Sequence, residues 1–471
     1  NNDISWGVTN ATRDVRDWYK IKFENASRTA YQHDGKLKNT TERIEEIKIR
    51  DKESVYDTVL YTHHGPVSYD INFKGDNQKA GYAMKWTGHI GGNNQRTFLE
   101  LNKAKNYDDY AQALKHHVAP AQNFIFSSTT GDIALWIQGT FPNKWKGQGK
   151  FLMDGSNPNH DWSGYIPQEH NAHVKNPERG FVSSANQHPT DESYPYYVFN
   201  DGYDTYRSRV INDFFRSKEK FDIQDFKNLH NNNYNLKAAE LLPHMLENMD
   251  TSTLGSEELE MLNELKKWDF YNDIEKKGPS IWEAWWNKLV PLTWDELNVD
   301  DIAYDYPFQY QTSFLLKNHS DDDFMDVVDT PEKETAKDLF LISFKAATNE
   351  LIEWKAKNGD YNWGDYKATF VGHLLQALPA FSRFNLPIGG NGGIVNATKK
   401  DHGPSWRMIV EMSNPPKALG IYPGGQSGNP GSKYYDDFVD IWASGNYLEL
   451  NFMQEKDQTE GVLFTQTLNP E

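Results

Sequence analysis

The sequence predicts a mixed α+β fold in which antiparallel sheet flanks a helical region. Residues 1–205 alternate short β-like runs with Gly, Pro and Asp turn signals, which is typical of extended antiparallel sheet. Residues 206–356 change to the spacing of apolar side chains that helices show. Residues 357–471 combine further strands with Gly-rich loops. We therefore expect a β-rich first part, a mainly helical second part, and a third part that completes the sheets.

The individual elements follow from the two patterns just described, the β-like runs between turn signals and the helical spacing of apolar side chains. Strands are predicted at 54–61, 80–87, 123–127 and 133–137, and again at 406–412, 448–452 and 462–465. Helices are predicted at 107–117, 238–249, 257–268 and 331–354, the third of them beginning at the acidic sequence after Ser256. The Gly-rich loops 388–393 and 423–431 lack the Gly-Lys-Ser/Thr that a phosphate-binding loop needs, so we interpret them as tight turns.

Composition excludes several classes of partner. The formal net charge of −18 argues against nucleic acid, whose binding needs a basic face. No apolar run reaches the length of a membrane span. Cysteine is absent, which excludes disulfides, thiolate metal sites and a Cys nucleophile from these residues. Aromatic residues reach 14%, which suits either a large sheet core or an aromatic-rich binding protein.

The adjacent residues His63 and His64 are a weak candidate for a metal site. Consecutive side chains of a strand point to opposite faces, so two such imidazoles cannot easily share one ion. We therefore expect both histidines to make structural hydrogen bonds.

Motifs in a fixed order run through the whole chain. They occupy residues 4–10, 14–17, 62–67, 82–87, 119–124, 131–134, 176–186, 206–210, 402–407 and 424–430. Together they resemble the penicillin acylase (penicillin amidase) family of N-terminal-nucleophile hydrolases, over the C-terminal part of the precursor. The resemblance implies a four-layer αββα sandwich of antiparallel sheets, truncated at the N-terminus and carrying a helical insertion.

The resemblance also implies a chemistry and three site residues. Such enzymes cut their own precursor and expose a Ser whose α-amino group serves as the base for attack on an amide. Asn10 falls where the family supplies a backbone N–H to the oxyanion hole, and Asn186 where it supplies a side-chain amide. Arg209 matches an arginine near the site. The alternatives are a turn-capping amide at Asn186 and a structural ion pair at Arg209.

A structural calcium ion is the implied cofactor. Asp14, the backbone carbonyl of Arg16 and Asp17 match part of the family's calcium site, and two carboxylates at a turn suit a hard cation. The sequence departs from the family at Val198, where another Asp is expected, and Asp201 or Asp204 are possible replacements. A plain acidic turn is the alternative.

The largest departure concerns the nucleophile, which the family carries several tens of residues before the position of Asn10. We therefore expect the Ser and a separate N-terminal chain of the same precursor to lie upstream, and these residues to be inactive alone. The expected substrate is a small N-acyl compound such as a penicillin, and an acyl-homoserine lactone is the alternative within enzymes. The resemblance implies a periplasmic or secreted protein.

Overall fold

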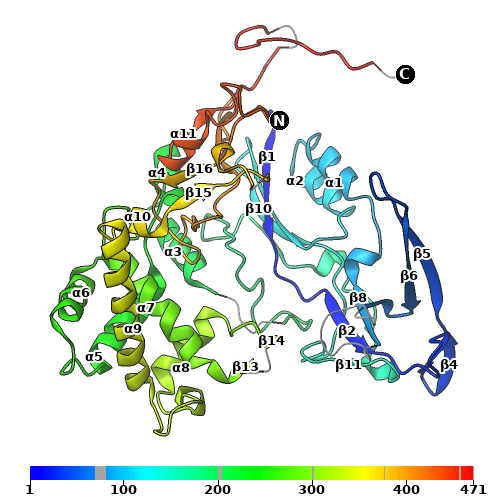
Figure 1. Ribbon diagram of the computed structural model, residues 1–471. Helices are drawn as coiled ribbons and strands as arrows, with labels where there is room; N and C mark the ends of the chain where they lie inside the picture. Colours follow the sequence, from blue (N-terminus) through cyan, green and yellow to red (C-terminus); the bar gives the residue numbers. More distant parts are fainter. Residues whose placement is uncertain (69–80, 200–203, 300–301, 376, 456–457, 470–471) are drawn as a thin grey trace. The chain divides into compact units, whose positions relative to one another are not determined.

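The computed structural model describes residues 1–68, 81–199, 204–299, 302–375, 377–455 and 458–469. The chain divides into two compact units, Asn1–Asp201 and Gly202–Glu471 (Figure 1). The predicted mixed α+β class is confirmed. Within the described ranges, no helix is both long enough and apolar enough to span a membrane.

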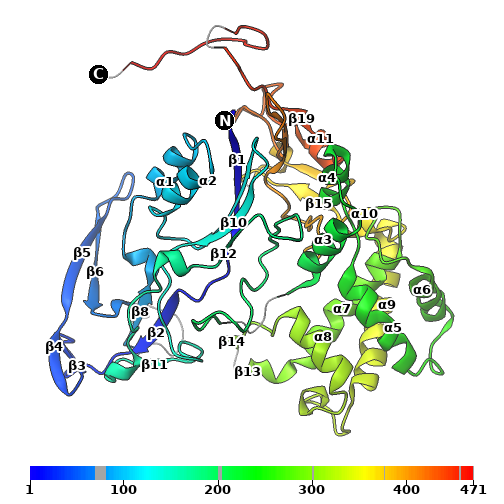
Figure 2. The same ribbon diagram turned by 180° about the vertical axis from the view of Figure 1, so that it is seen from behind.

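The first unit contains a four-stranded antiparallel sheet. Within the described residues its order is β1 (Ile4–Asn10), β9 (Gln122–Ser128), β10 (Ile133–Gln138) and β12 (His173–Lys175). Helices α1 (Asn94–Leu101) and α2 (Tyr107–Leu114) lie beside it in both ribbon views (Figures 1 and 2). Because side chains alternate along a strand, Phe124 and Phe126 of β9 pack toward these helices, while Asn123 points to the other face.

A second sheet of the first unit has six strands in the described residues. Their order is β11 (Met153–Asp154), β2 (Arg16–Lys20), β8 (Tyr82–Trp86), β7 (Gly65–Ser68), β6 (Val55–Thr62) and β5 (Thr41–Ile47). A ribbon of β3 (Ala30–His33) and β4 (Lys36–Asn39) follows β2 in sequence. The buried rings of Tyr19 and Tyr31 join these strands in one core. Short 3-10 turns are η2 (Thr87–His89), η3 (Pro158–His160) and η4 (Gln168–His170).

The second unit is mainly helical in its first part. Its helices are α3 (Tyr206–Arg216), α4 (Ile223–His230), α5 (Leu236–Asn248), α6 (Ser256–Lys267), α7 (Gly278–Thr293), α8 (Gln309–Asn318), α9 (Ala336–Asn358), α10 (Trp363–Lys367) and α11 (Val439–Ala443). The longest, α9, packs along α7, and Trp285 donates its indole N–H to the Phe340 carbonyl and the Ser343 hydroxyl. Large buried aromatic rings thus hold this helical core together.

Short strands complete the second unit. They are β13 (Asn298–Val299), β14 (Ile302–Ala303), β15 (Thr369–Val371), β16 (Arg383–Leu386), β17 (Arg407–Glu411), β18 (Lys417–Ile421) and β19 (Leu448–Glu449), with 3-10 turns η5 (Asp295–Leu297), η6 (Asp323–Met325) and η7 (Pro379–Phe381). The predicted division at 205 and 356 into three parts stays a prediction.

Three predicted elements differ from the structure, and of the strand expected at 448–452 only Leu448–Glu449 pairs, as β19. The helix expected at 331–354 begins only at Ala336, because the Asp338 carboxylate accepts the Thr335 backbone N–H at 2.9 Å and caps the helix there. The strand expected at 462–465 is wrong. Leu463 and Phe464 are more than 80% exposed and belong to no strand of the described chain. An apolar run predicts a strand only where a neighbouring strand can pair with it.

Candidate functional site

Asn10 and Asn186, 176 residues apart, meet at the end of β1. The side-chain amide of Asn186 donates to the backbone carbonyl of Asn10 at 2.6 Å. Asn123 donates to the same carbonyl at 3.0 Å. One residue earlier, the hydroxyl groups of Thr9 and Ser184 lie 3.0 Å apart. The structure therefore brings together the two residues that the sequence pairs in one site.

The backbone of Asn186 is in the left-handed region, with φ of +64°. Asn tolerates this conformation better than other residues with a side chain, because its short amide can hydrogen-bond locally. The carboxamide nitrogen carries two N–H groups, and the bond to Asn10 uses one of them. Local geometry thus fixes the direction of the amide without a regular helix or strand.

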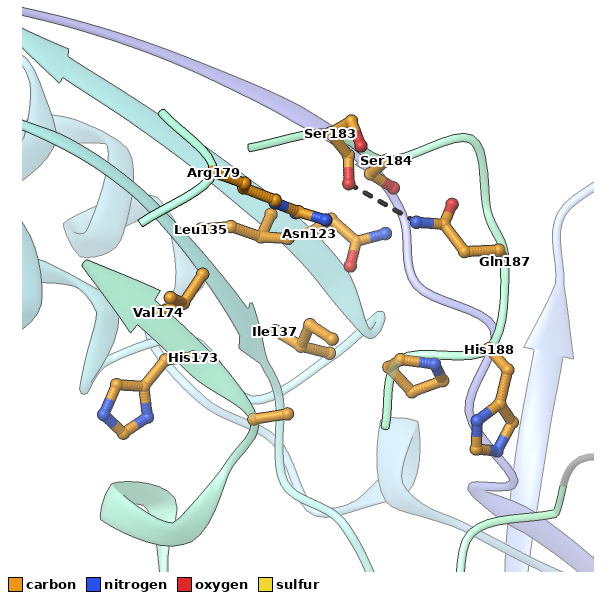
Figure 3. A pocket seen from close by; sticks show the side chains of 12 residues that line it. Asn123, Leu135, Ile137, His173, Val174, Arg179, Ser183, Ser184, Gln187 and His188 are labelled. Carbon is orange, nitrogen blue, oxygen red and sulfur yellow. Dashed lines mark hydrogen bonds between the residues drawn. The ribbon is translucent and has the colours of Figure 1, made fainter. Parts of the chain in front are cut away.

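A polar cavity of about 300 Å³ lies on the face of the four-stranded sheet opposite α1 and α2. Its lining consists of Asn123, Leu135, Ile137, Ala172, His173, Val174, Arg179, Ser183, Ser184, Gln187, His188 and Pro189. Figure 3 shows apolar side chains of β10 at its floor and polar side chains of the loop that carries Asn186 at its rim. This combination suits a substrate with an apolar group and a polar reacting group.

Asn123 is a site residue that the sequence indicates only as part of the motif at 119–124. It lines this cavity and also donates to the Thr9 hydroxyl at 3.2 Å. A signal was present, because Asn123 precedes the apolar run Phe124–Phe126 of a strand, and a polar side chain that is buried there has to find a hydrogen-bond partner.

A second cavity of about 540 Å³ opens on the helix-covered face of the same sheet. Asn10 lines it together with the apolar side chains of Val8, Phe98 and Pro120. His117 also lines it, and burial lowers the pKa of this imidazole below its usual value. Asn10 therefore borders this second cavity, while Asn123, which donates to the Asn10 carbonyl, lines the first.

Arg209 lies on α3 and forms a two-pronged ion pair with Glu240 on α5. Its Nη1 contacts Glu240 Oε1, and its Nη2 donates to Glu240 Oε2 at 2.9 Å. The hydrogen bond to this carboxylate raises the pKa of Arg209. The ion pair favours the structural alternative, and a role of Arg209 in the site stays a prediction.

The ammonium group of Lys144 lies between the two carboxylates predicted to bind calcium. Its Nζ donates to Asp17 Oδ1 at 2.7 Å and lies 2.8 Å from Asp14 Oδ1. The other oxygen of Asp17 accepts the Trp162 indole N–H at 2.5 Å. Burial raises the pKa of Asp14, and the charge of Lys144 opposes that shift.

This arrangement does not fit a further cation at these residues. A calcium ion needs six to eight oxygen ligands, and both oxygens of Asp17 already accept hydrogen bonds. Arg16 begins β2 between the two carboxylates, and Val198 is half-buried in a loop. Of the possible replacements, Asp201 lies outside the described residues, and Asp204 accepts the backbone N–H of Tyr310 at 3.0 Å. Calcium at Asp14, Arg16 and Asp17 stays a prediction, and the position of Lys144 between the two carboxylates does not favour it.

The expectation that His63 and His64 point away from each other is wrong. They form the two-residue turn between β6 and β7, where the alternation of a strand no longer applies, and their ring centres lie 3.8 Å apart. Burial lowers the pKa of His63 to about 4 and that of His64 to about 3. Both imidazoles are therefore neutral near pH 7.

Comparisons with known proteins agree with the sequence motifs. The penicillin amidase family model matches residues 1–459. The chain is 23% identical to an acyl-homoserine lactone acylase of Pseudomonas aeruginosa, over 98% of this chain and 61% of that protein. It is 22% identical to the penicillin acylase 2 proenzyme of a Pseudomonas species, over 98% of this chain and 60% of that protein. The chain thus spans about 60% of the length of these relatives.

The fold has a close counterpart among solved structures. The thermostable penicillin G acylase of Alcaligenes faecalis matches with a TM-score of 0.70 and 14% identity, over 100% of this chain and 89% of that one. At this identity the match establishes the fold alone, which is that of N-terminal-nucleophile hydrolases, as the motifs predicted. Since the family model covers nearly all residues, the chain belongs to the penicillin amidase family.

Proposed function

We propose that this chain forms the larger part of an acylase, which hydrolyses the linear amide between an acyl group and an amine. The observation that supports the proposal is the contact between Asn186 and Asn10 at the end of β1. The Asn186 Nδ2 atom lies 2.6 Å from the Asn10 carbonyl oxygen, and the neighbouring Ser184 lines a cavity. Family membership supplies the reaction class, because the relatives are named as acylases of penicillin and of acyl-homoserine lactones.

In the proposed reaction, a Ser outside these 471 residues is the nucleophile. Its own α-amino group takes the hydroxyl proton, and its oxygen bonds to the acyl carbon. Negative charge then develops on the carbonyl oxygen, where the Asn10 backbone N–H and the Asn186 amide donate hydrogen bonds. The C–N bond breaks, and the amine leaves with the transferred proton. Water then cleaves the ester and releases the acid.

The partner in this proposal is an N-terminal chain of the same precursor. In the part of the chain that the structure describes, β1 pairs with β9 on one side and has no strand on its other side. Such an open edge can accept a further strand through backbone hydrogen bonds. Self-cleavage of a precursor, a periplasmic or secreted location, and inactivity of these residues alone belong to the same proposal.

The substrate is a small N-acyl compound, and two candidates are open. The penicillin acylase relative favours a β-lactam amine, and the acyl-homoserine lactone acylases favour a lactone amine. Hydrolysis of one acyl group attached to either amine, followed by mass spectrometry, compares the two directly. Varying the acyl length on one amine then measures the acyl specificity.

The test of the proposed site uses Asn186→Gly in the full-length protein. Glycine tolerates the left-handed backbone, so this substitution removes the amide with little strain. We expect kcat to fall by about 10²–10³, the usual loss for one oxyanion donor. The matched control is Asn176→Gly, since Asn176 also has a positive φ and bonds to the backbone of a strand, at Ile133.

Turnover of the Asn186→Gly variant within a few-fold of the Asn176→Gly control would exclude the oxyanion role. A full-length protein that binds N-acyl amines but hydrolyses none of them would instead support a non-catalytic binding protein.

A further inference from the structure

Three histidines and one aspartate of the first unit converge on one point. His33 ends β3, His63 and His64 form the turn between β6 and β7, and Asp161 follows η3. One ligand atom of each residue lies within 4.8 Å of the corresponding atoms of the other three. The chain thus gathers four metal-binding side chains from three separate segments.

The hydrogen bonds behind these rings set their protonation. Nδ1 of His33 and Nε2 of His64 lie 3.0 and 3.2 Å from the backbone carbonyl of Gly155. A carbonyl only accepts, so each of these nitrogens carries the proton, and in a neutral ring the opposite nitrogen has a lone pair. Those opposite nitrogens are the atoms that face Asp161. Metal-binding histidines commonly have such a carbonyl partner behind the ring.

Without a cation, the unprotonated nitrogens of His33 and His64 face the carboxylate of Asp161. All of these atoms accept hydrogen bonds and none of them donates one. His64 Nδ1 and Asp161 Oδ1 lie 3.7 Å apart, and both are buried without a hydrogen-bond partner in the described residues. Leaving buried polar atoms unpaired is costly, and such atoms call for a bound group. A metal ion at the centre would satisfy the imidazole lone pairs and the carboxylate together.

The distances fit a tetrahedral ion. Nitrogen and oxygen ligands of zinc at their usual bond lengths lie about 3.3–3.6 Å from one another. Asp161 Oδ2 lies 3.3 Å from His33 Nε2, and Asp161 Oδ1 lies 3.6 Å from His63 Nε2 and 3.7 Å from His64 Nδ1, so the three separations are close to this range. Three imidazoles and one carboxylate suit a first-row transition metal better than calcium or magnesium, which prefer oxygen.

Neighbouring residues hold the ligands in place. The Tyr31 hydroxyl accepts the His63 backbone N–H at 3.0 Å and lies 2.9 Å from Nδ1 of the same residue, which leaves Nε2 directed at Asp161. Gly155 has no space for a side chain, because a Cβ there would lie 2.9 Å from the Lys20 carbonyl. This close approach lets one carbonyl reach two rings.

We propose that His33, His63, His64 and Asp161 form a structural zinc site in the first unit. Four protein ligands fill the tetrahedral sphere, so the ion ties together β3, the β6–β7 turn and the loop after η3. The site is separate from Asn10 and Asn186 and takes no part in the proposed acyl transfer.

The experiment measures metal binding by the full-length protein after chelation and dialysis, with zinc chloride or cobalt chloride as the only probe. We expect one zinc per chain by elemental analysis, a rise in melting temperature with zinc, and the visible absorption of tetrahedral cobalt. His64→Gln and Asp161→Asn should lose the bound metal and the rise in melting temperature. His116→Gln is the control, because His116 lies in the same unit and pairs with Glu100 instead.

Binding is read directly from the wild-type protein, so the test does not depend on activity or on the folding of any variant. A wild-type protein that takes up no zinc at micromolar concentration would overturn the proposal. Unchanged stoichiometry in His64→Gln and Asp161→Asn would also overturn it, by placing the ion elsewhere.

Discussion

Replacing Lys144 with Met removes the positive charge that lies between Asp14 and Asp17. Met keeps a long side chain, so packing changes less than it would with Ala. The Lys144 and Asp17 side chains are 2% and 0% exposed, and that of Asp14 is 18% exposed. Water therefore cannot replace the lost ammonium group. The variant would leave two neighbouring carboxylates in a buried place with the Trp162 indole as a remaining donor.

Breaking a buried ion pair in this way costs about 3–5 kcal/mol. In a domain of about 150–250 residues, each kcal/mol lowers the melting temperature by roughly 2–4 °C. The first unit is Asn1–Asp201, which lies in that range. We therefore expect its melting temperature to fall by about 6–20 °C at pH 7.

The loss of stability caused by Lys144→Met should be smaller at lower pH. Burial raises the pKa of Asp14 already in the presence of Lys144, whose charge lowers it. Removing Lys144 raises that pKa further. Because the folded state then binds a proton more tightly than the unfolded chain, its stability rises as the pH falls through this raised pKa. The difference between variant and wild type should thus be larger at pH 7 than at pH 5.

Thermal unfolding followed by circular dichroism at both pH values measures these effects. Lys146→Met is the matched control, since Lys146 is exposed in the same loop. A Lys144→Met variant that melts with the control would refute the reasoning. Calcium chloride should raise the melting temperature of Lys144→Met and leave that of the wild type unchanged. A calcium-dependent rise in the wild type would mean that the ion binds while Lys144 is present.

Two further substitutions test the contacts of Asp17 and of Glu240. Gly149→Ala should destabilise the protein by more than about 1 kcal/mol, because φ is +88° and the new Cβ would lie 2.1 Å from Asp17 Oδ1. Gly147→Ala, with φ of +91° and an ordinary contact of 3.9 Å from its new Cβ to the Trp145 ring, is the control in the same thermal assay, and equal losses would contradict the clash. Arg209→Ala should cost about 1 kcal/mol or less, since Arg209 and Glu240 are both more than a third exposed. A tenfold fall in kcat of the full-length Arg209→Ala protein would instead point to a role in the site.

The sequence predicts most of the elements that have a strong local period. The helix at 238–249 and the strand at 133–137 lie within two residues of α5 and β10. The strand predicted at 462–465 fails, because nothing in a local pattern says whether a partner strand is available. Strand pairing depends on the whole fold, so an isolated apolar run does not indicate whether a partner strand lies beside it.

The candidate site shows the same limit in its contacts. The family resemblance places Asn10 and Asn186 in one site. It gave neither the left-handed backbone of Asn186 nor the carbonyl that its amide contacts. Similarly, Asp14 and Asp17 were recognised as partners of a cation, while Lys144 is 127 residues from Asp17 in sequence. A single sequence does not indicate that two residues so far apart along the chain are in contact.

The carboxylates of Asp17 and Asp161 in the first unit meet different partners, and the Asp161 side chain is partly buried, with 29% exposed. Asp17 faces an ammonium group and an indole N–H, so both of its oxygens meet donors. Asp161 faces Nε2 of His33 and Nδ1 of His64, and because the other nitrogen of each ring directs its proton at the Gly155 carbonyl, these two nitrogens offer Asp161 lone pairs instead. A buried negative charge needs a positive partner. The fold supplies that charge to Asp17 from Lys144, whereas the partly buried Asp161 faces the imidazole rings of His33, His63 and His64, which is why we propose an external cation at Asp161.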